Sequence, residues 1–154
     1  MLRDLLADTE QPDDVALVLA RLQPPPLVET CPARPEELAG IRRTVRAWAF
    51  AAALDEDTTD DLQLAINEAV ANAVEHAYGS GPAGVVHYSV TRAGDGAVDV
   101  VVRDEGRWRP PPADSGSRGR GLALIRRLTT DVEVEHPTAD GGTAVRFRLL
   151  PAAG

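Results

Sequence analysis

Two short motifs contain the residue types of a ligand site. Asp104-Glu105-Gly106 follows a stretch with strand periodicity. There the carboxylate can accept a hydrogen bond, and the glycine lets a planar ligand approach the backbone. Arg118-Gly119-Arg120-Gly121-Leu122 opens a short predicted helix, where exposed backbone N–H groups and the helix dipole favour phosphate oxygens. Each motif alone is also common in ordinary turns, so its meaning depends on what accompanies it.

Two further motifs accompany them. Glu68 and Asn72 are four residues apart in a stretch with helical periodicity, so we expect both side chains on one helix face. Asp61 and Glu75 extend the same polar stripe, which alone also fits a solvated helix face. Gly141-Gly142-Thr143 precedes the last predicted strand and by itself fits a hairpin turn. No GxGxxG sequence follows a strand, and the chain contains no lysine, which excludes the dinucleotide-binding turn and the Walker-type phosphate loop.

The elements that must position these motifs follow from hydrophobic periodicity. Apolar residues at helical spacing predict two amphipathic helices, the second of them capped by Thr58 or Thr59. Alternating residues predict two antiparallel hairpins, each with one apolar face that helices must cover. We therefore expect an α+β two-layer sandwich with a mostly antiparallel sheet. The expected elements are a strand at 27–30, helices at 38–52 and 62–77, a hairpin at 85–102, a short helix at 121–128 and a hairpin at 132–149.

Composition excludes several classes of protein. The 154 residues carry 16 basic and 24 acidic side chains, a net charge of −8, which disfavours nucleic acid as a partner because such a surface repels phosphate. No apolar run approaches the roughly 18 residues of a membrane-spanning helix. The single cysteine, Cys31, excludes an internal disulfide bond. We therefore expect a cytoplasmic protein with neither a membrane nor a nucleic-acid partner.

The order and wording of the four motifs resemble a known family. Residues 67–78 read Asn-Glu-Ala-Val-Ala-Asn-Ala-Val-Glu-His-Ala-Tyr, and Asp-x-Gly, Gly-x-Gly-Leu and Gly-Gly-Thr follow in that order. The combination resembles the GHKL (Bergerat-fold) ATP-binding domain of DNA gyrase B, histidine kinases and MutL. The helical stretch is similar to the anti-sigma-factor serine kinase branch of that family. The resemblance covers about residues 27–150.

The resemblance implies a site for ATP and Mg²⁺. By this resemblance, Asn72 would hold the metal ion and contribute to ATP binding, and Glu68 would be the general base that takes a proton from a serine hydroxyl or from water. Asp104 would bind the adenine amino group, Gly106 would let the ring approach, and Thr143 would contribute through its hydroxyl or a water molecule. The residues implied at the phosphates are Gly119, Arg120, Gly121 and Leu122.

The resemblance also implies partners. The chain would be an Mg-ATP-dependent serine kinase that phosphorylates a STAS-type anti-anti-sigma protein and binds a sigma factor, in bacterial transcription regulation. Arg42 aligns with an arginine of the family that contacts the partner. A homodimer built on the first strand and helix is expected, with Trp48 and Phe50 as its large apolar residues.

Two other functions stay open. An ATP-sensing module without phosphoryl transfer is favoured by Trp108, where the family often has a glycine, and by Pro110–Pro112 in a short predicted lid. The intact Glu68 favours transfer, because a pure binding module has no need of a carboxylate there. A histidine-kinase catalytic domain is disfavoured, because no long helical hairpin with a phosphoacceptor histidine precedes the domain.

Residues 1–22 are expected to come from a domain other than the ATP-binding domain. Residues 1–22 contain an apolar run at 15–20 that predicts a buried strand, and residues 23–26 form a proline-rich linker. The run with Asp13 and Asp14 resembles the last strand of PPM-type (SpoIIE-like) serine phosphatases. So short a piece lacks the carboxylates of a two-metal site. We therefore expect the chain to be the C-terminal part of a longer protein.

Overall fold

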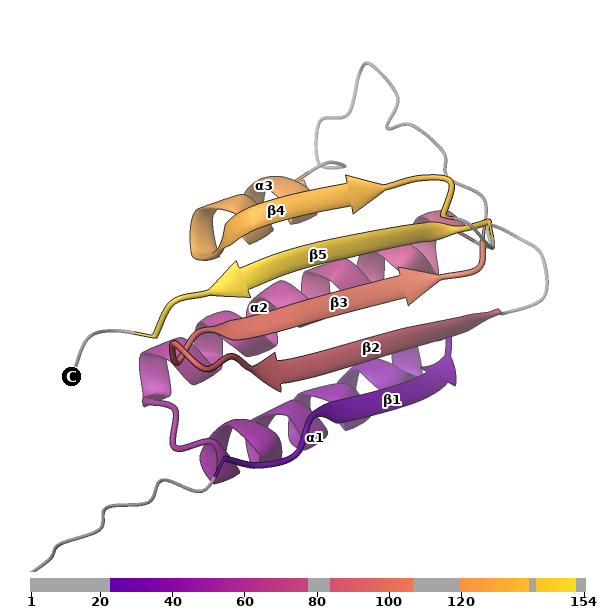
Figure 1. The fold of residues 1–154 in the computed structure, drawn as a ribbon. Coiled ribbons are helices and arrows are strands. Elements are labelled where there is room, and N and C mark those ends of the chain that lie inside the picture. Colours follow the sequence, from indigo (N-terminus) through magenta and orange to yellow (C-terminus); the bar gives the residue numbers. More distant parts are fainter. Residues whose placement is uncertain (1–22, 78–83, 107–119, 139–140, 152–154) are drawn as a thin grey trace, which may run out of the picture.

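The fold is seen in a computed structural model that describes residues 23–77, 84–106, 120–138 and 141–151, with only the backbone of His76, Ala77 and Arg120. The elements, drawn in Figure 1, are β1 (Leu27–Pro32), a 3₁₀ turn η1 (Pro35–Glu37), α1 (Leu38–Ala51), α2 (Glu56–Asn72), a π-helical turn η2 (Ala73–Ala77), β2 (Val85–Arg92), β3 (Val98–Asp104), α3 (Arg120–Leu128), β4 (Thr130–Glu135) and β5 (Thr143–Leu149). The apolar run at 15–20 lies outside the described residues.

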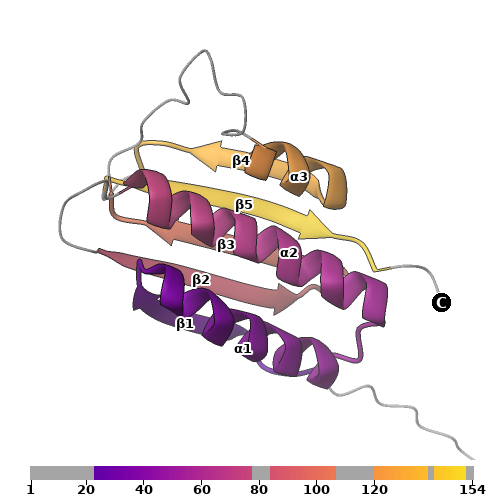
Figure 2. The same cartoon turned by 180° about the vertical axis from the view of Figure 1, so that it is seen from behind.

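The five strands form one antiparallel sheet in the order β1-β2-β3-β5-β4. The helices α1, α2 and α3 all lie on one face of this sheet, as the two opposite views in Figures 1 and 2 show. The expected two-layer α+β sandwich is therefore confirmed. Both predicted hairpins are present, and the first strand extends two residues further than expected.

The core lies between the sheet and the helices. Alternate residues of the three central strands point into it, as the period of two predicts. Helices α1 and α2 contribute the residues at helical spacing, and α3 contributes Ile125. The core side chains of the central strands are Val86, Tyr88, Val90, Val98, Val100, Val102, Val145, Phe147 and Leu149.

The start of α2 differs from the sequence prediction. The cap is Asp55, not Thr58 or Thr59, and its Oδ1 atom accepts a hydrogen bond from the Thr58 N–H at 2.7 Å. The Thr58 hydroxyl donates to the other carboxylate oxygen at 2.6 Å. These bonds lower the pKa of Asp55, because they stabilise its ionised form. The helix therefore begins one turn earlier than the threonines suggested.

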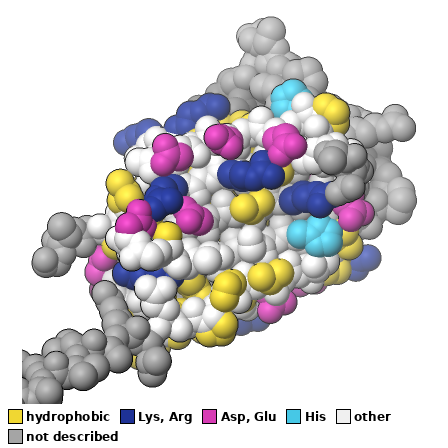
Figure 3. Space-filling view, viewed as in Figure 1, with side chains coloured by type: hydrophobic (Ala, Val, Ile, Leu, Met, Phe, Trp, Pro, Cys, Tyr) yellow, Lys and Arg dark blue, Asp and Glu magenta, His cyan; other side chains and the backbone are white. Residues whose placement is uncertain are grey.

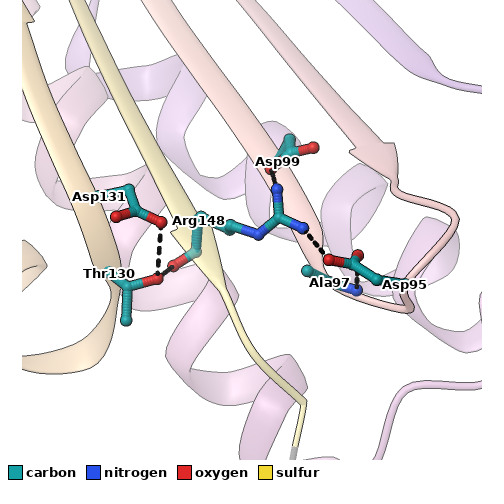
Figure 4. A network of polar contacts seen from close by, with 6 residues as sticks. All are labelled: Asp95, Ala97, Asp99, Thr130, Asp131 and Arg148. Atoms are coloured by element: carbon teal, nitrogen blue, oxygen red, sulfur yellow. Dashed lines mark hydrogen bonds and ion pairs between the residues drawn. The ribbon is translucent and has the colours of Figure 1, made fainter.

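The outer face of the sheet is polar. Figure 3 shows basic and acidic side chains interspersed on this face. Arg148 donates to Asp99 Oδ1 at 3.1 Å and also pairs with Asp95, which lies in the turn between β2 and β3 (Figure 4). Arg146 pairs with Glu135 across β5 and β4 at 2.7 Å. The outer face of the sheet therefore carries charged side chains, whereas the opposite face of the same strands is apolar.

Trp48 is not at the surface. Its side chain is 7% exposed, and its Nε1–H donates to the backbone oxygen of Pro25 at 2.9 Å. The expectation that Trp48 forms part of a dimer surface is therefore wrong, because its apolar ring is already covered by the core. Phe50, two residues later, is 86% exposed. Across the described residues, no helix has the length and apolar character needed to cross a membrane.

Candidate active site

Glu68 and Asn72 meet the start of α3. Both residues lie on α2, half-buried, and α3 packs against α2. A Cβ atom placed on Gly121 would lie 2.9 Å from Glu68 Oε2 and 3.0 Å from Asn72 Nδ2. Gly121 therefore lets the backbone of α3 come close to both polar groups. The helix motif and the Gly-x-Gly-Leu motif therefore lie next to each other in space.

Asp104 is the last residue of β3. It lies between Val86 of β2 and Thr143 of β5 in the register of the sheet. Its Oδ1 atom accepts a hydrogen bond from the Gly106 N–H at 2.9 Å. Asp104 and Thr143 are 6% and 5% exposed. The Asp-x-Gly turn therefore holds a buried carboxylate beside the first residue of β5.

Burial raises the pKa of the Asp104 carboxyl above its ordinary value. The backbone N–H groups of Gly106 and Thr143 act in the opposite direction, as does the charge of Arg103, but desolvation is the largest effect. Carboxylates in such an environment need a further donor to offset the loss of water. An amino group on a bound planar ligand is such a donor.

Gly142 shapes the same turn. Its φ angle is +82°, and a Cβ atom there would overlap the backbone oxygen of Asp104 and lie 2.8 Å from Glu105 Cα. The Gly-Gly-Thr motif thus contributes a close backbone contact as well as Thr143. The sequence motif contained this glycine, but its contact with Asp104 depends on the pairing of β3 with β5 and could not be predicted from either strand alone.

These groups lie at one end of the molecule. The turn η2, which continues α2, contacts β3, and Figure 1 shows the end of α2, the end of β3 and the start of β5 at the same end of the sheet. Glu68, Asn72 and Gly121 form one group, and Asp104, Gly106 and Thr143 form the other. Leu122 is half-buried against the core. Gly119, the Arg120 side chain and the predicted lid with Trp108 lie outside the described residues.

Arg42 lies on α1, which packs against α2. It is exposed, and its Nη1 atom donates to Asn67 Oδ1 at 2.9 Å. Asn67 immediately precedes Glu68, and sequence reasoning assigned it no role. Asn67 is the first residue of the helix motif, so the sequence places it next to Glu68. Its contact with Arg42 of α1 could not be predicted from that motif.

The residues present fit ATP and a magnesium ion. A buried carboxylate suits an amino group of adenine, and the glycine-lined start of α3 suits phosphate oxygens. Among the described residues, no group of three or more His, Cys, Asp or Glu side chains could hold a metal. Mg²⁺ usually takes one or two protein ligands together with nucleotide phosphates and water. The Asn72 carboxamide oxygen is a suitable ligand of that kind.

Comparison with known families identifies the domain. The sequence profile described as "Histidine kinase-like ATPase domain" matches residues 31–149, which is most of the chain and includes both groups of site residues. This chain belongs to the histidine kinase-like ATPase family.

Within this ATPase family, the similar proteins include an anti-sigma F factor and a serine-protein kinase. An anti-sigma F factor of Geobacillus stearothermophilus is 46% identical over 125 residues, which cover 72% of this chain and 83% of the relative. A serine-protein kinase RsbW of Oceanobacillus iheyensis is 28% identical over 119 residues, which cover 68% and 75%.

A solved structure also resembles this ATPase chain. It holds the RsbU and RsbW domains of a Mycobacterium tuberculosis protein and superimposes with a TM-score of 0.69 at 29% identity. The match covers 85% of this chain but 34% of the longer one. The two chains therefore share one domain fold, and the rest of the longer protein has no counterpart in that match.

Proposed function

We propose that the chain is an ATP-dependent serine-protein kinase of the anti-sigma-factor type. In this proposal it transfers the γ-phosphoryl group of Mg-ATP to a serine of a STAS-domain anti-anti-sigma protein, and it also binds a sigma factor. The names of its relatives, anti-sigma F factor and serine-protein kinase RsbW, support this assignment. The supporting observation within the chain is that Glu68 and Asn72 converge on Gly121.

Each site residue has a role in this proposal. Glu68 accepts the proton of the serine hydroxyl as the serine oxygen bonds to the γ-phosphorus and the bond to the ADP oxygen breaks. Asn72 would hold Mg²⁺, whose charge would offset that of the phosphates. Asp104 accepts a hydrogen bond from the adenine amino group, supported by Gly106 and Thr143. The phosphates would lie against the backbone at the start of α3, at Arg120, Gly121 and Leu122, and Gly119 is proposed as a further contact on the sequence motif alone.

The proposed partner contact lies where α1 meets α2. Arg42 is exposed on α1 and donates to Asn67, the residue before Glu68, so a protein docked over Arg42 would lie next to the turn that carries Glu68. We propose Arg42 as a contact of the STAS-domain protein. We also propose a cytoplasmic location, no nucleic-acid partner, and a phosphatase-like origin for residues 1–22.

The test is transfer of labelled phosphate. The full chain is incubated with γ-labelled ATP, Mg²⁺ and a panel of STAS-domain proteins from bacterial sigma-factor systems. We expect one or more of them to be labelled on serine, and we expect EDTA to abolish labelling. ATP binding without labelling of any STAS protein would contradict the kinase proposal and leave an ATP-binding regulatory module.

A further inference from the structure

Two side chains of α2 hold one residue of α1. Asn67 Oδ1 accepts a hydrogen bond from Arg42 Nη1 at 2.9 Å, and Gln63 Nε2 donates to the backbone oxygen of Arg42 at 2.8 Å. Gln63 and Asn67 are one helical turn apart, so both face α1. Successive residues of a helix point about 100° apart. The α2 turn at 67–68 therefore presents Asn67 to α1 and Glu68 to α3.

The exposed side of α1 carries arginines. Helix α1 carries three exposed arginines, Arg42, Arg43 and Arg46, and no acidic residue within Leu38–Ala51. The whole chain has a net charge of −8, so this row is opposite in sign to the chain as a whole. Figure 2 shows α1 and α2 side by side on the helical face of the molecule. Such a row fits a protein partner whose docking surface carries carboxylates.

Arg42 is held in a way that the other arginines of this row are not. The ion pair of Arg46 with Asp60 is long, at 3.8 Å, and both side chains are more than half exposed. The hydrogen bond between Arg42 and Asn67 is also exposed, but at 2.9 Å it lies within normal hydrogen-bond distance. The Arg42 guanidinium uses one N–H for Asn67, and its geometry leaves further donors for a partner carboxylate. Fixing it before docking reduces the rotamer entropy that binding must offset.

We infer that Asn67 is a positioning residue that fixes the Arg42 guanidinium as a docking contact for an acidic surface of the protein substrate. Because Asn67 precedes Glu68 on the same turn, the docking contact and the general base keep a constant spacing. The inference rests on the proposed kinase function, since it concerns the substrate of that reaction. It adds to that function a residue and a surface chemistry of the partner.

The experiment compares two changes at one position. Asn67→Leu removes the acceptor at similar volume, and Asn67→Asp keeps an acceptor for the guanidinium. With the STAS-domain protein that the wild-type chain phosphorylates, we expect Asn67→Leu to raise KM about two- to tenfold. We expect kcat and ATP affinity to stay near the wild-type values. Asn67→Asp should restore the affinity for the STAS-domain protein, measured by calorimetry.

A double-mutant cycle separates positioning from general damage. Arg42→Ala should weaken docking, and adding Asn67→Leu to Arg42→Ala should weaken it no further, because the arginine that Asn67 positions is already absent. The matched control is Asp60→Asn, which removes the charge that Arg46 of α1 pairs with on α2 and leaves Arg42 in place. We expect this control not to raise KM. Thermal unfolding of every variant excludes loss of fold as the cause.

Two results would overturn the inference while leaving the kinase function intact. One is additive effects of Arg42→Ala and Asn67→Leu on KM. The other is a loss of kcat or ATP affinity in Asn67→Leu with an unchanged KM for the protein substrate. If the wild-type chain labels no STAS-domain protein at all, the proposed function fails and the positioning role fails with it.

Discussion

Gly121 of α3 lies so close to Glu68 of α2 that a Cβ atom on the glycine would be 2.9 Å from Glu68 Oε2. That distance is below any ordinary contact with a carbon atom. The same Cβ would also lie 3.0 Å from the amide nitrogen of Asn72. The absence of a side chain at Gly121 therefore sets the spacing between the start of α3 and the two polar groups of α2.

Gly121→Ala is expected to reduce both ATP affinity and phosphoryl transfer, because Glu68 and Asn72 must move to admit the methyl group. The atoms that must give way are the ends of two flexible side chains, so we expect the fold to be kept and the cost to fall on the site. The expected loss of ATP affinity is about tenfold, or about 1.4 kcal/mol. Calorimetry and labelled-phosphate transfer measure the two effects. Wild-type values for both would show that the close contact has no part in the site.

Gly40→Ala is the matched control. Gly40 also lies in a helix, α1, but its nearest neighbour to an added Cβ is a side-chain nitrogen of Arg43 at 3.9 Å. Replacing an unhindered helical glycine by alanine usually stabilises by about 0.5–1 kcal/mol. We therefore expect a slightly higher melting temperature with unchanged ATP affinity.

Gly142→Ala is expected to destabilise the chain more than Gly141→Ala. Both glycines have positive φ angles, +82° and +80°, so both variants lose about 1–2 kcal/mol of backbone energy. Only at position 142 does the new Cβ also overlap the backbone of Asp104, whereas nothing lies within 4 Å at position 141. Denaturant unfolding compares the two, and equal losses would contradict the contact between Gly142 and Asp104.

Asp104→Asn is expected to bind ATP more weakly. The amide keeps the shape of the side chain but removes the charge that would attract the adenine amino group. Hydrogen bonds to charged groups contribute about 1.5–3 kcal/mol, which corresponds to a roughly ten- to hundredfold loss of affinity. Isothermal calorimetry with Mg-ATP measures it. Affinity equal to that of the wild type would show that Asp104 is not the adenine contact.

The same substitution has a pH-dependent effect on stability. The folded-state pKa of Asp104 is raised from its ordinary value of 3.8, so the folded state binds this proton more tightly than the unfolded state does. The stability due to the proton is full below pH 3.8 and is lost as pH rises to the folded-state pKa. Without nucleotide, Asp104→Asn should therefore gain stability relative to the wild type across that window. A gain that vanished as pH rose would contradict burial as the cause.

A homodimer is predicted from the first strand and helix. β1 is an edge strand of the sheet, Val28 on it is 71% exposed, and Phe50 on α1 is 86% exposed. Sedimentation equilibrium should show a dimer that Phe50→Ser weakens. Leu150→Ser is the control, because Leu150 is also exposed, at 63%, but follows β5. A strict monomer at high concentration would remove the prediction.

Periodicity was sufficient to predict the layers of this fold. Alternation in β2 and β3 and helical spacing in α1 and α2 each reflect one buried face, so the sequence pattern and the core contain the same residues. The Asp55 cap was missed because Asp55, Thr58 and Thr59 are all residue types that cap helices. Trp48 was expected at a dimer surface because it is large and apolar, but its side chain lies in the core.

The site was predictable as a set of motifs but not as an arrangement. Glu68, Asn72 and Asp104 are polar residues at element ends or on a helix face, where sequence reasoning can find them. The fit of Gly121 against Glu68 depends on how α3 packs on α2, and that packing depends on apolar residues such as Ile125. The contact of Asn67 with Arg42 likewise joins two helices, so no single motif contains it.

Asn72→Ala and a change at Glu68 are expected to have different effects on ATP affinity and on phosphoryl transfer. This change removes the proposed ligand of Mg²⁺, so both ATP affinity and transfer should fall. Glu68 makes no proposed contact with adenine or the metal. A change there should affect only the step in which the serine hydroxyl loses its proton.

The most direct test of the kinase account is therefore the transfer rate of Glu68→Gln at saturating Mg-ATP, with ATP affinity measured on the same preparation. Removing a general base usually lowers the rate about 10²- to 10⁴-fold. We predict a loss of that size in phosphorylation of the STAS-domain protein, with ATP affinity within about twofold of the wild type because no ground-state hydrogen bond to the nucleotide is removed. Phosphorylation of the same protein by Glu68→Gln at the wild-type rate would contradict the account.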